Sequence, residues 1–262
     1  MVIFREKKPA SSLLQHGRIR LDRLLVERGV FETRSRARDA VLRGTVRSGN
    51  NILLKPGLIV APDLDIIIDD SARRYVSRAA LKLIAGLDGF GVQAEGRNAV
   101  DIGASAGGFT QVLLERGVGH VTAVDVGHGQ MHQRLAGDAR ITLYEGLNAR
   151  DLSQVHFQAG LPDLVVSDVS FISLRLALPP VLALALPGAV ALLLVKPQFE
   201  AGREAIGKNG LLKEPASAEK VAADLFHWLD SFPQWCACGL LPSPIEGGSG
   251  NREFLLYGKK KQ

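Results

Sequence analysis

The chain has 262 residues, 46% of them hydrophobic and 23% charged, a balance that supports a sizeable core and excludes an intrinsically disordered protein. Its two cysteines exclude a disulfide-built secreted framework. The net charge of +5 is unevenly spread, because residues 1–80 hold 16 lysines and arginines against 9 aspartates and glutamates, and residues 81–262 hold 16 against 18. This split predicts a basic, polyanion-binding segment joined to a more neutral catalytic segment.

The N-terminal part reads as an extension over residues 1–17, too polar for a signal sequence, followed by a small α+β RNA-binding domain over residues 18–70. We expect a helix from Leu21 that stops at Gly29, and a second helix, capped by Thr33 or Ser35, that stops at Gly44. Arginines flank the apolar stripe of the second helix, so we expect them to be exposed and to bind RNA phosphates; a solvated face without function is the alternative. The candidate RNA-binding residues are Arg20, Arg34, Arg36, Arg38, Arg43 and Arg47.

Short strands are expected around a hairpin-like turn at residues 48–51 and again over residues 66–68. Residues 71–81 form a polar linker, after which residues 82–262 alternate strands and helices. This alternation predicts a doubly wound, mostly parallel α/β sheet. Its expected parallel strands cover residues 98–103, 120–125, 141–145, 163–168 and 190–195.

Two further strands, over residues 235–241 and 252–257, are joined by a loop with no room for a crossover helix. They should pair as a hairpin, which makes seven strands with an antiparallel last one. Cys236 and Cys238 lie two apart on the first of them and lack metal-site spacing, so we expect them in the core, and we expect no metal site.

The stretch from Leu176 to Val195 is uncharged, largely apolar and long enough to cross a membrane. Pro179 and Pro180 suit a helix start, and Pro187-Gly188 suits a turn into a buried strand. A helix, a turn and a strand are therefore expected instead of a membrane span.

The stretch from Val100 to Thr110 runs from an apolar strand through a glycine-rich turn into a helix, and a second strand ends at Asp125. A glycine loop followed by an acidic strand end is typical of a nucleotide-cofactor site. The loop order G-x-S-x-G-G differs from the dinucleotide pattern G-x-G-x-x-G, which favours S-adenosylmethionine; a dehydrogenase and a tight turn without ligand are the alternatives. The candidate cofactor-binding residues are Asp101, Gly103, Ala104, Ser105, Gly107, Gly108, Phe109, Asp125, Asn148 and Asp168.

Polar residues also end the later strands of the expected sheet. Asn148 follows the third strand, Asp168 ends the fourth and Lys196 ends the fifth. In open α/β sheets ligands bind beyond these strand ends. Asp168 and Lys196 therefore form a candidate acid–base pair, with a structural ion pair as the alternative.

Five blocks of sequence, at residues 75–83, 125–130, 167–174, 195–202 and 250–255, resemble the TlyA family of ribosomal-RNA 2′-O-methyltransferases, also called hemolysin A-like. The resemblance extends over about residues 18–258. It implies an N-terminal domain like that first seen in the fourth small-subunit ribosomal protein, and an FtsJ-type methyltransferase domain. It also implies S-adenosylmethionine as cofactor, cytidine in ribosomal RNA or ribosomal subunits as substrate, and a cytoplasmic location.

The resemblance further implies a catalytic tetrad of two lysines and two carboxylates. By position in the matching blocks, these residues are Lys82, Asp168, Lys196 and Glu253, with Glu246 as a competitor for the last place. Lys196 would take the proton of the ribose hydroxyl, with Lys82 as a neighbouring cation and the carboxylates holding both. A non-enzymatic ribosome-assembly factor and a membrane-active hemolysin are the alternative functions.

Overall fold

The structure is a computed structural model, and it describes residues 4–5, 17–247 and 250–262. The chain divides into two compact units, Met1–Arg74 and Tyr75–Gln262. This division falls inside the expected linker 71–81, and the expected N-terminal extension 1–17 lies mostly outside the described residues.

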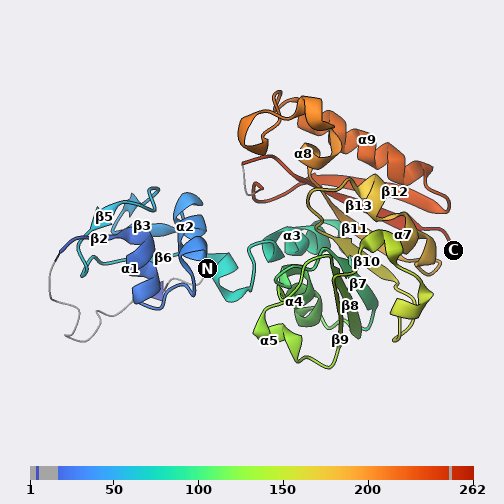
Figure 1. Cartoon of the computed structure of the whole chain (residues 1–262), viewed down its shortest axis with the longest axis horizontal. Coiled ribbons are helices and arrows are strands. Elements are labelled where there is room, and N and C mark those ends of the chain that lie inside the picture. The colour runs from blue at the N-terminus through green and yellow to red at the C-terminus, as the bar shows by residue number, and fades with distance from the viewer. Residues whose placement is uncertain (1–3, 6–16, 248–249) are drawn as a thin grey trace. The chain divides into compact units, whose positions relative to one another are not determined.

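The first unit packs two short helices beside small sheets (Figure 1). Thr33 caps the second helix by accepting a hydrogen bond from the backbone N–H of Arg36 at 3.3 Å. A core of buried aliphatic side chains, Leu21, Leu25 and Val41 among them, joins the helices to the strands. The elements are β1 (Phe4–Arg5), β2 (Ile19–Arg20), α1 (Leu21–Glu27), α2 (Arg34–Leu42), β3 (Val46–Ser48), β4 (Asn51–Ile52), β5 (Ile59–Val60), β6 (Ile67–Ile68) and η1 (Ser71–Arg74). One sheet has the order β1-β6-β3-β4, and β2 pairs with β5.

The expectation that all the flanking arginines are exposed is wrong for Arg36, whose side chain is 24% exposed, and for Arg43. The Arg43 side chain is 16% exposed and lies 2.8 Å from carboxylates of both Asp39 and Asp70. Asp70 comes from a segment remote in sequence, which is why the helix pattern alone gave no sign of this partner.

Other arginines of this unit are also held by acidic groups. Arg20 and Arg34 each lie 3.1 Å from the carboxylate of Asp22, whose side chain is fully buried. These contacts lower the pKa of Asp22 to about 2, chiefly through the hydrogen bonds from Arg20. Arg38 is exposed and, within the described part of the chain, has no ion-pair partner. Arg38 thus differs from Arg20 and Arg34 in that no carboxylate of the described residues pairs with it.

The second unit is built on a seven-stranded sheet of order β12-β13-β11-β10-β7-β8-β9, which confirms the predicted fold class. Six strands run in one direction, and β13 is antiparallel to both of its neighbours. Its strands are β7 (Asn98–Ile102), β8 (His120–Asp125), β9 (Ile141–Glu145), β10 (Leu164–Ser167), β11 (Val190–Val195), β12 (Trp235–Pro242) and β13 (Phe254–Lys260).

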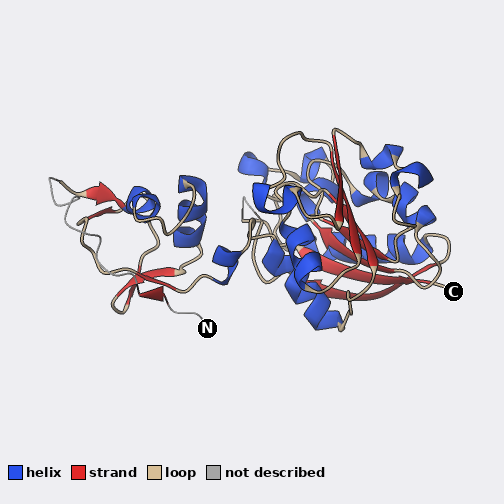
Figure 2. Ribbon diagram, turned by 90° about the horizontal axis from the view of Figure 1, so that it is seen from below, coloured by secondary structure: helices blue, strands red, loops and turns tan. Residues whose placement is uncertain are grey.

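Helices cover both faces of this sheet (Figure 2). Alternate residues of β11 divide between two cores: Leu192 packs with α3 and α4 on one face, and Leu193 packs with α6, α7 and α9 on the other. This is the near-continuous apolar strand expected of a sheet buried on both faces. The helices are α3 (Ala80–Phe90), α4 (Gly108–Glu115), α5 (Gln133–Ala136), α6 (Leu174–Ala177), α7 (Pro179–Leu184), α8 (Pro197–Glu200) and α9 (Ser217–Ser231), with the 3-10 helices η2 (Ala149–Asp151), η3 (Gln154–His156), η4 (Arg203–Ala205) and η5 (Lys208–Gly210).

The stretch from Leu176 to Val195 folds as expected, with Pro179 opening α7 and a turn leading into the buried strand β11. No helix in the described ranges is both long and apolar enough to cross a membrane.

Cys236 and Cys238 are not core residues. Both are exposed, because the alternation of β12 turns Trp235 and Ala237 inward and the cysteines outward. The register also shifts at this point of the β12–β13 pairing, between Ala237 and Gly239. The prediction that the two cysteines share a side holds, but that side faces solvent.

Candidate active site

The glycine loop between β7 and α4 is packed tightly against the rest of the unit. Gly103 has φ +85°, and a Cβ atom there would lie 2.8 Å from the carbonyl oxygen of Asp168. At Gly108 a Cβ atom would lie 2.9 Å from Cβ of Ser77, in the segment before α3. Contacts within the protein are therefore enough to require glycine at both positions, whether or not the loop binds a ligand.

Asp125, at the end of β8, fastens this loop to the next one. Its two carboxylate oxygens accept backbone N–H bonds from Ser105 at 2.8 Å and from Gly127 at 2.7 Å. The hydroxyl of Ser105 donates to Oε1 of Gln130 at 3.0 Å. Because a carboxylate oxygen has two lone pairs, each oxygen of Asp125 can accept one further hydrogen bond from a ligand.

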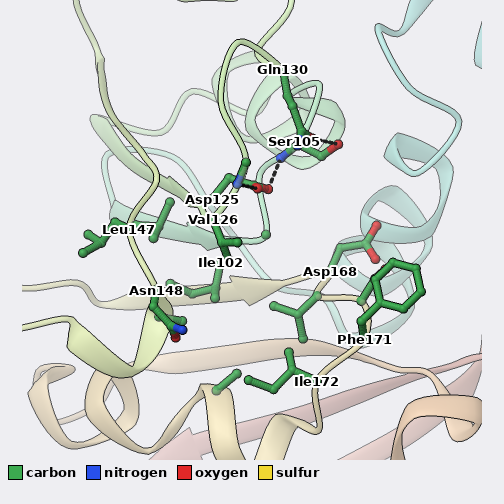
Figure 3. Close-up of a pocket in the computed structure, with 17 residues that line it drawn as sticks. Ile102, Ser105, Asp125, Val126, Gln130, Leu147, Asn148, Asp168, Phe171 and Ile172 are labelled. Atoms are coloured by element: carbon green, nitrogen blue, oxygen red, sulfur yellow. Dashed lines mark hydrogen bonds between the residues drawn. The ribbon is translucent and has the colours of Figure 1, made fainter.

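A cavity of about 580 Å³ opens beside Asp125 at the carboxyl ends of the parallel strands (Figure 3). This volume falls in the range of small-molecule sites. Asn148 lines it, and the Oδ1 of Asn148 accepts hydrogen bonds from the backbone and side chain of Arg150, while among the described residues its Nδ2 amide has no acceptor. Its walls combine apolar side chains with these polar groups, and they include Ile102, Val124, Val126, Leu147, Phe171 and Ile172.

A smaller cavity of about 140 Å³ adjoins the first, and both are lined by Gly103, Ser105, Asp168 and Ser170. Ala104, Gly108 and Phe109 of the glycine loop also line the smaller cavity, as does Lys196. Of the sequence-predicted cofactor residues, Gly107 and Asp101 line neither of these two cavities.

Asp168 and Lys196 lie together where the two cavities meet, as their positions at neighbouring strand ends predict. Oδ1 of Asp168 is 2.6 Å from Nζ of Lys196. Nζ also donates to Oγ of Ser170 at 2.8 Å and lies 6.0 Å from the ring centroid of Phe199. Nothing in the sequence analysis assigned a role to Ser170.

A second lysine–carboxylate pair stands near the first. Nζ of Lys82, on α3, is 2.5 Å from Oε2 of Glu253, and both side chains are buried. Val195, the last residue of β11, pairs with Phe254, the first residue of β13. Lys196 and Glu253 therefore lie just beyond the neighbouring ends of these two strands. Glu246 is exposed, and the structure therefore pairs Glu253, not Glu246, with Lys82.

Asp101 is fully buried below the glycine loop, where Oδ2 accepts the hydroxyl hydrogen bond of Thr110 at 2.7 Å. Its other oxygen has no hydrogen-bond partner within the described structure. Burial, with smaller contributions from Asp168 and Asp125, raises the pKa of Asp101 to about 7. Its place favours a role in holding the loop, away from direct contact with a ligand.

The raised pKa of Asp101 predicts a pH-dependent stability. Between the unfolded pKa and about 7, the folded protein binds a proton that the unfolded chain has released, so the free energy of unfolding falls as pH rises through this window. We expect Asp101→Asn to remove about 2–4 kcal/mol of that fall between pH 5 and pH 8. Urea unfolding followed by tryptophan fluorescence measures it, since Trp228 and Trp235 both lie in the second unit. If the free energy of unfolding depended equally on pH in the variant and the wild type, the raised pKa would not belong to Asp101.

Glu145 is a further residue that the sequence analysis missed. It accepts backbone N–H bonds from Gly129 at 2.8 Å and Gln130 at 3.0 Å, and these bonds lower its pKa. Glu145 thereby fastens the loop after Asp125 to strand β9. No motif spacing could have indicated this contact, because it depends on how the loop folds back.

A family model described as FtsJ-like methyltransferase matches residues 75–260, the whole of the sheet and the site. The chain belongs to the FtsJ-like methyltransferase family. Within that family it falls among the TlyA and hemolysin A-like proteins, as the sequence blocks predict, and it is a methyltransferase.

Relatives match nearly the whole chain. A proposed rRNA methyltransferase of Bacillus subtilis, YqxC, is 45% identical over 241 residues, which cover 91% of this chain and 84% of the relative. The 16S/23S rRNA (cytidine-2′-O)-methyltransferase TlyA of Mycobacterium tuberculosis is 39% identical over 241 residues, covering 92% and 89%. Among solved structures, a proposed hemolysin from Streptococcus thermophilus matches with a TM-score of 0.73 and 40% identity, covering 94% of this chain and 89% of that one.

Proposed function

We propose that this FtsJ-like methyltransferase uses S-adenosylmethionine to methylate a ribose 2′-hydroxyl of ribosomal RNA, with cytidine as the modified nucleotide. The observation that carries the proposal is the Asp168–Lys196 pair, placed at the junction of a nucleoside-sized cavity and a smaller one. The names of the TlyA relatives support ribosomal RNA and cytidine.

The residues of the larger cavity suit this cofactor. Asp125 offers carboxylate oxygens for a ribose diol, Asn148 offers an amide donor for a base acceptor, and the apolar walls suit a purine. The glycine loop leaves the smaller cavity open next to Asp168, where an amino-acid moiety fits. When bound, S-adenosylmethionine supplies an electrophilic methyl group, whose bond to the positive sulfur breaks with both electrons passing to sulfur as the nucleophile bonds to the carbon.

The protein has to prepare the nucleophile, because a ribose hydroxyl scarcely ionises at neutral pH. In its neutral form the Nζ atom of Lys196 can accept the hydroxyl proton, and Asp168 then stabilises the resulting ammonium. The Lys82–Glu253 pair is proposed to complete the tetrad by orienting the RNA substrate at the carboxyl ends of the strands.

Phe171 supports an unpaired nucleotide as the substrate. Its side chain is 90% exposed, its φ is +66°, and its ring packs on Phe199 at 5.1 Å between centroids. A large apolar ring held in this strained backbone conformation at a cavity edge suits stacking against a base.

The deciding experiment follows labelled methyl transfer from S-adenosylmethionine to ribosomal subunits and to their purified RNA. Mapping of 2′-O-methyl sites in ribosomal RNA, from cells with and without the protein, then identifies the nucleotide. We expect new methylation on a cytidine ribose. Unchanged ribosomal RNA together with intact RNA binding would instead identify a non-enzymatic ribosome-assembly factor.

Replacing Asp125 tests the cofactor site. Asp125→Ala should weaken S-adenosylhomocysteine binding by about 10- to 150-fold, since hydrogen bonds to a charged group contribute about 1.5–3 kcal/mol. Calorimetric titration measures the affinity, and Glu246→Ala, an exposed carboxylate, is the control. Unchanged affinity of Asp125→Ala would remove Asp125 from the site.

Arg38 tests the RNA role of the first unit. Arg38→Gln should weaken RNA binding and lower the salt dependence of the binding constant by about one unit of slope, because one phosphate contact is lost. Arg23→Gln is the matched control, since Arg23 is exposed on α1 but is paired with Glu27 at 2.6 Å. Filter binding over a salt series measures both. Equal slopes for the two variants would place the RNA contact elsewhere.

A further inference from the structure

The two cysteines of the chain lie close together on the outer strand of the large sheet, away from the cavities. β12 stands at the edge of the strand order (Figure 1), and both Cys236 and Cys238 are exposed on it. Cys236 pairs with Lys259 near the end of β13, whereas Phe254 begins β13 at the end of the sheet that carries the site. The chemistry of these two thiols is therefore separate from the proposed methyl transfer.

The strand is distorted at this point in a way that brings the two cysteines together. The register shifts between Ala237 and Gly239, which leaves Cys238 as an extra residue, a bulge, in β12. In a regular strand, residues two apart are separated by about 6.4–6.8 Å, the upper end of the range of about 4.4–6.8 Å between the Cα atoms of a disulfide. A bulge bends its strand and shortens that separation. Sγ of Cys238 accordingly lies 3.3 Å from the backbone carbonyl oxygen of Cys236.

Ala237, between the two cysteines, is fixed to the rest of the second unit. Its side chain is buried, and its backbone N–H donates to Oδ1 of Asp230 on α9 at 3.1 Å. The two cysteine side chains lie on the other face of the strand, in solvent. They can therefore rotate toward each other while the backbone that carries them stays in place.

The two sulfur atoms also interact through charge. Negative charge on the sulfur of Cys238 raises the pKa of the Cys236 thiol more than any other neighbouring group does. Cys236 therefore stays protonated while Cys238 is charged. The Lys259 ammonium lies near Cys238, and its pKa is raised, first by Tyr257 and to a smaller extent by Cys238. A lysine beside a cysteine makes the sulfur more reactive, because the positive charge stabilises the thiolate.

We propose that Cys236 and Cys238 form a redox modification site, which a low-molecular-weight disulfide oxidises to an intrachain disulfide. The thiolate of Cys238 attacks one sulfur of that reagent, whose S–S bond breaks and releases a first thiolate. The mixed disulfide removes the charge that kept Cys236 protonated, so Cys236 ionises, attacks Sγ of Cys238 and releases a second thiolate. The cysteines give up two electrons and two protons, which reduce the reagent to two thiols.

Glutathione disulfide added to the full-length protein tests this proposal. We expect the protein to lose both free thiols and the mass of two hydrogen atoms, and to retain no glutathione. Peptide mapping should then place the bridge between Cys236 and Cys238 of one chain. A wild type that stays reduced, keeps glutathione on either cysteine or crosslinks two chains would overturn the inference.

Single variants separate the two steps of the reaction. Cys236→Ser should keep glutathione on Cys238, because the thiol that would displace it is gone. In that background Lys259→Gln should slow the addition of glutathione by about 2- to 10-fold. Lys261→Gln is the matched control, since Lys261 is also exposed and the change in charge is the same. Equal rates for the two lysine variants would contradict the first attack by Cys238 beside Lys259.

The same reaction in urea separates the effect of the fold from that of the local sequence, since Cys-Ala-Cys persists in the unfolded chain. If the bulge brings the sulfur atoms together, the step from the mixed disulfide to the bridge should be at least about 10-fold faster in the folded protein. Equal rates in the folded and unfolded chains would overturn the part of the inference that rests on the bulge. Circular dichroism recorded before each reaction shows that the protein is folded.

Discussion

Lys196→Ala is expected to lower the single-turnover rate of methyl transfer by about 10²–10⁴-fold, the range for a lost general base. The reason is its position, since Nζ of Lys196 lies 2.6 Å from Asp168 and borders the smaller cavity. The affinity for S-adenosylhomocysteine should change little, because Lys196 does not line the larger cavity, where Asp125 and Asn148 are proposed to hold the nucleoside. Rapid-quench methylation and calorimetric titration of the same preparations separate these two effects.

Lys196→Arg is the sharper substitution. A guanidinium keeps the positive charge, and with it the attraction for RNA, but it scarcely releases a proton at neutral pH and so cannot serve as a base. We expect this variant to bind both ligands and methylate poorly. A rate near that of the wild type would show that Lys196 acts as a positioning charge.

The second large effect concerns the buried pair of Lys82 and Glu253. Lys82→Met should destabilise the second unit by about 3–5 kcal/mol, because it leaves the buried carboxylate of Glu253 without its partner. The double variant Lys82→Met/Glu253→Gln removes both charges and should recover most of this stability. Urea unfolding followed by tryptophan fluorescence measures both variants.

Activity then separates a structural pair from a catalytic one. If the pair belongs to the tetrad, the double variant should fold and bind S-adenosylhomocysteine but should methylate RNA at least about 100-fold more slowly than the wild type. A folded double variant with full activity would assign Lys82 and Glu253 to stability alone. Glu246→Gln provides the matched control, because Glu246 is exposed in the loop before Glu253.

The sheet was predictable from sequence because its strands are short apolar runs that end in turn residues. Expected and observed strands agree to within a residue or two for the five strands from β7 to β11, while β13 begins two residues later than expected and extends to Lys260. The expected helices between the later strands were less accurate. The β8–β9 crossover contains the four-residue α5, and the β9–β10 crossover contains the 3-10 helices η2 and η3.

The site was predictable only where a residue stands at a strand end. Asp125, Asp168 and Lys196 could be located in this way, since strand order alone brings their ends to one edge. Contacts made by loops could not, and so the hydrogen bonds of Ser170 and Glu145 appear only in the structure. The partner of Arg43 and the outward side of Cys236 were misjudged because both depend on pairing between segments distant in sequence.

The reversed direction of β13 has a practical consequence for labelling the protein. Because β13 begins beside Lys196 and runs against β11, its last residues leave the sheet at the edge opposite the cavities. Lys261 is fastened there by its backbone N–H to the carbonyl of Gln234 at 2.7 Å. A fluorophore or affinity tag placed after Gln262 would therefore emerge at the end of the sheet opposite the cavities, and would suit assays in which the cavities must stay open to added ligands.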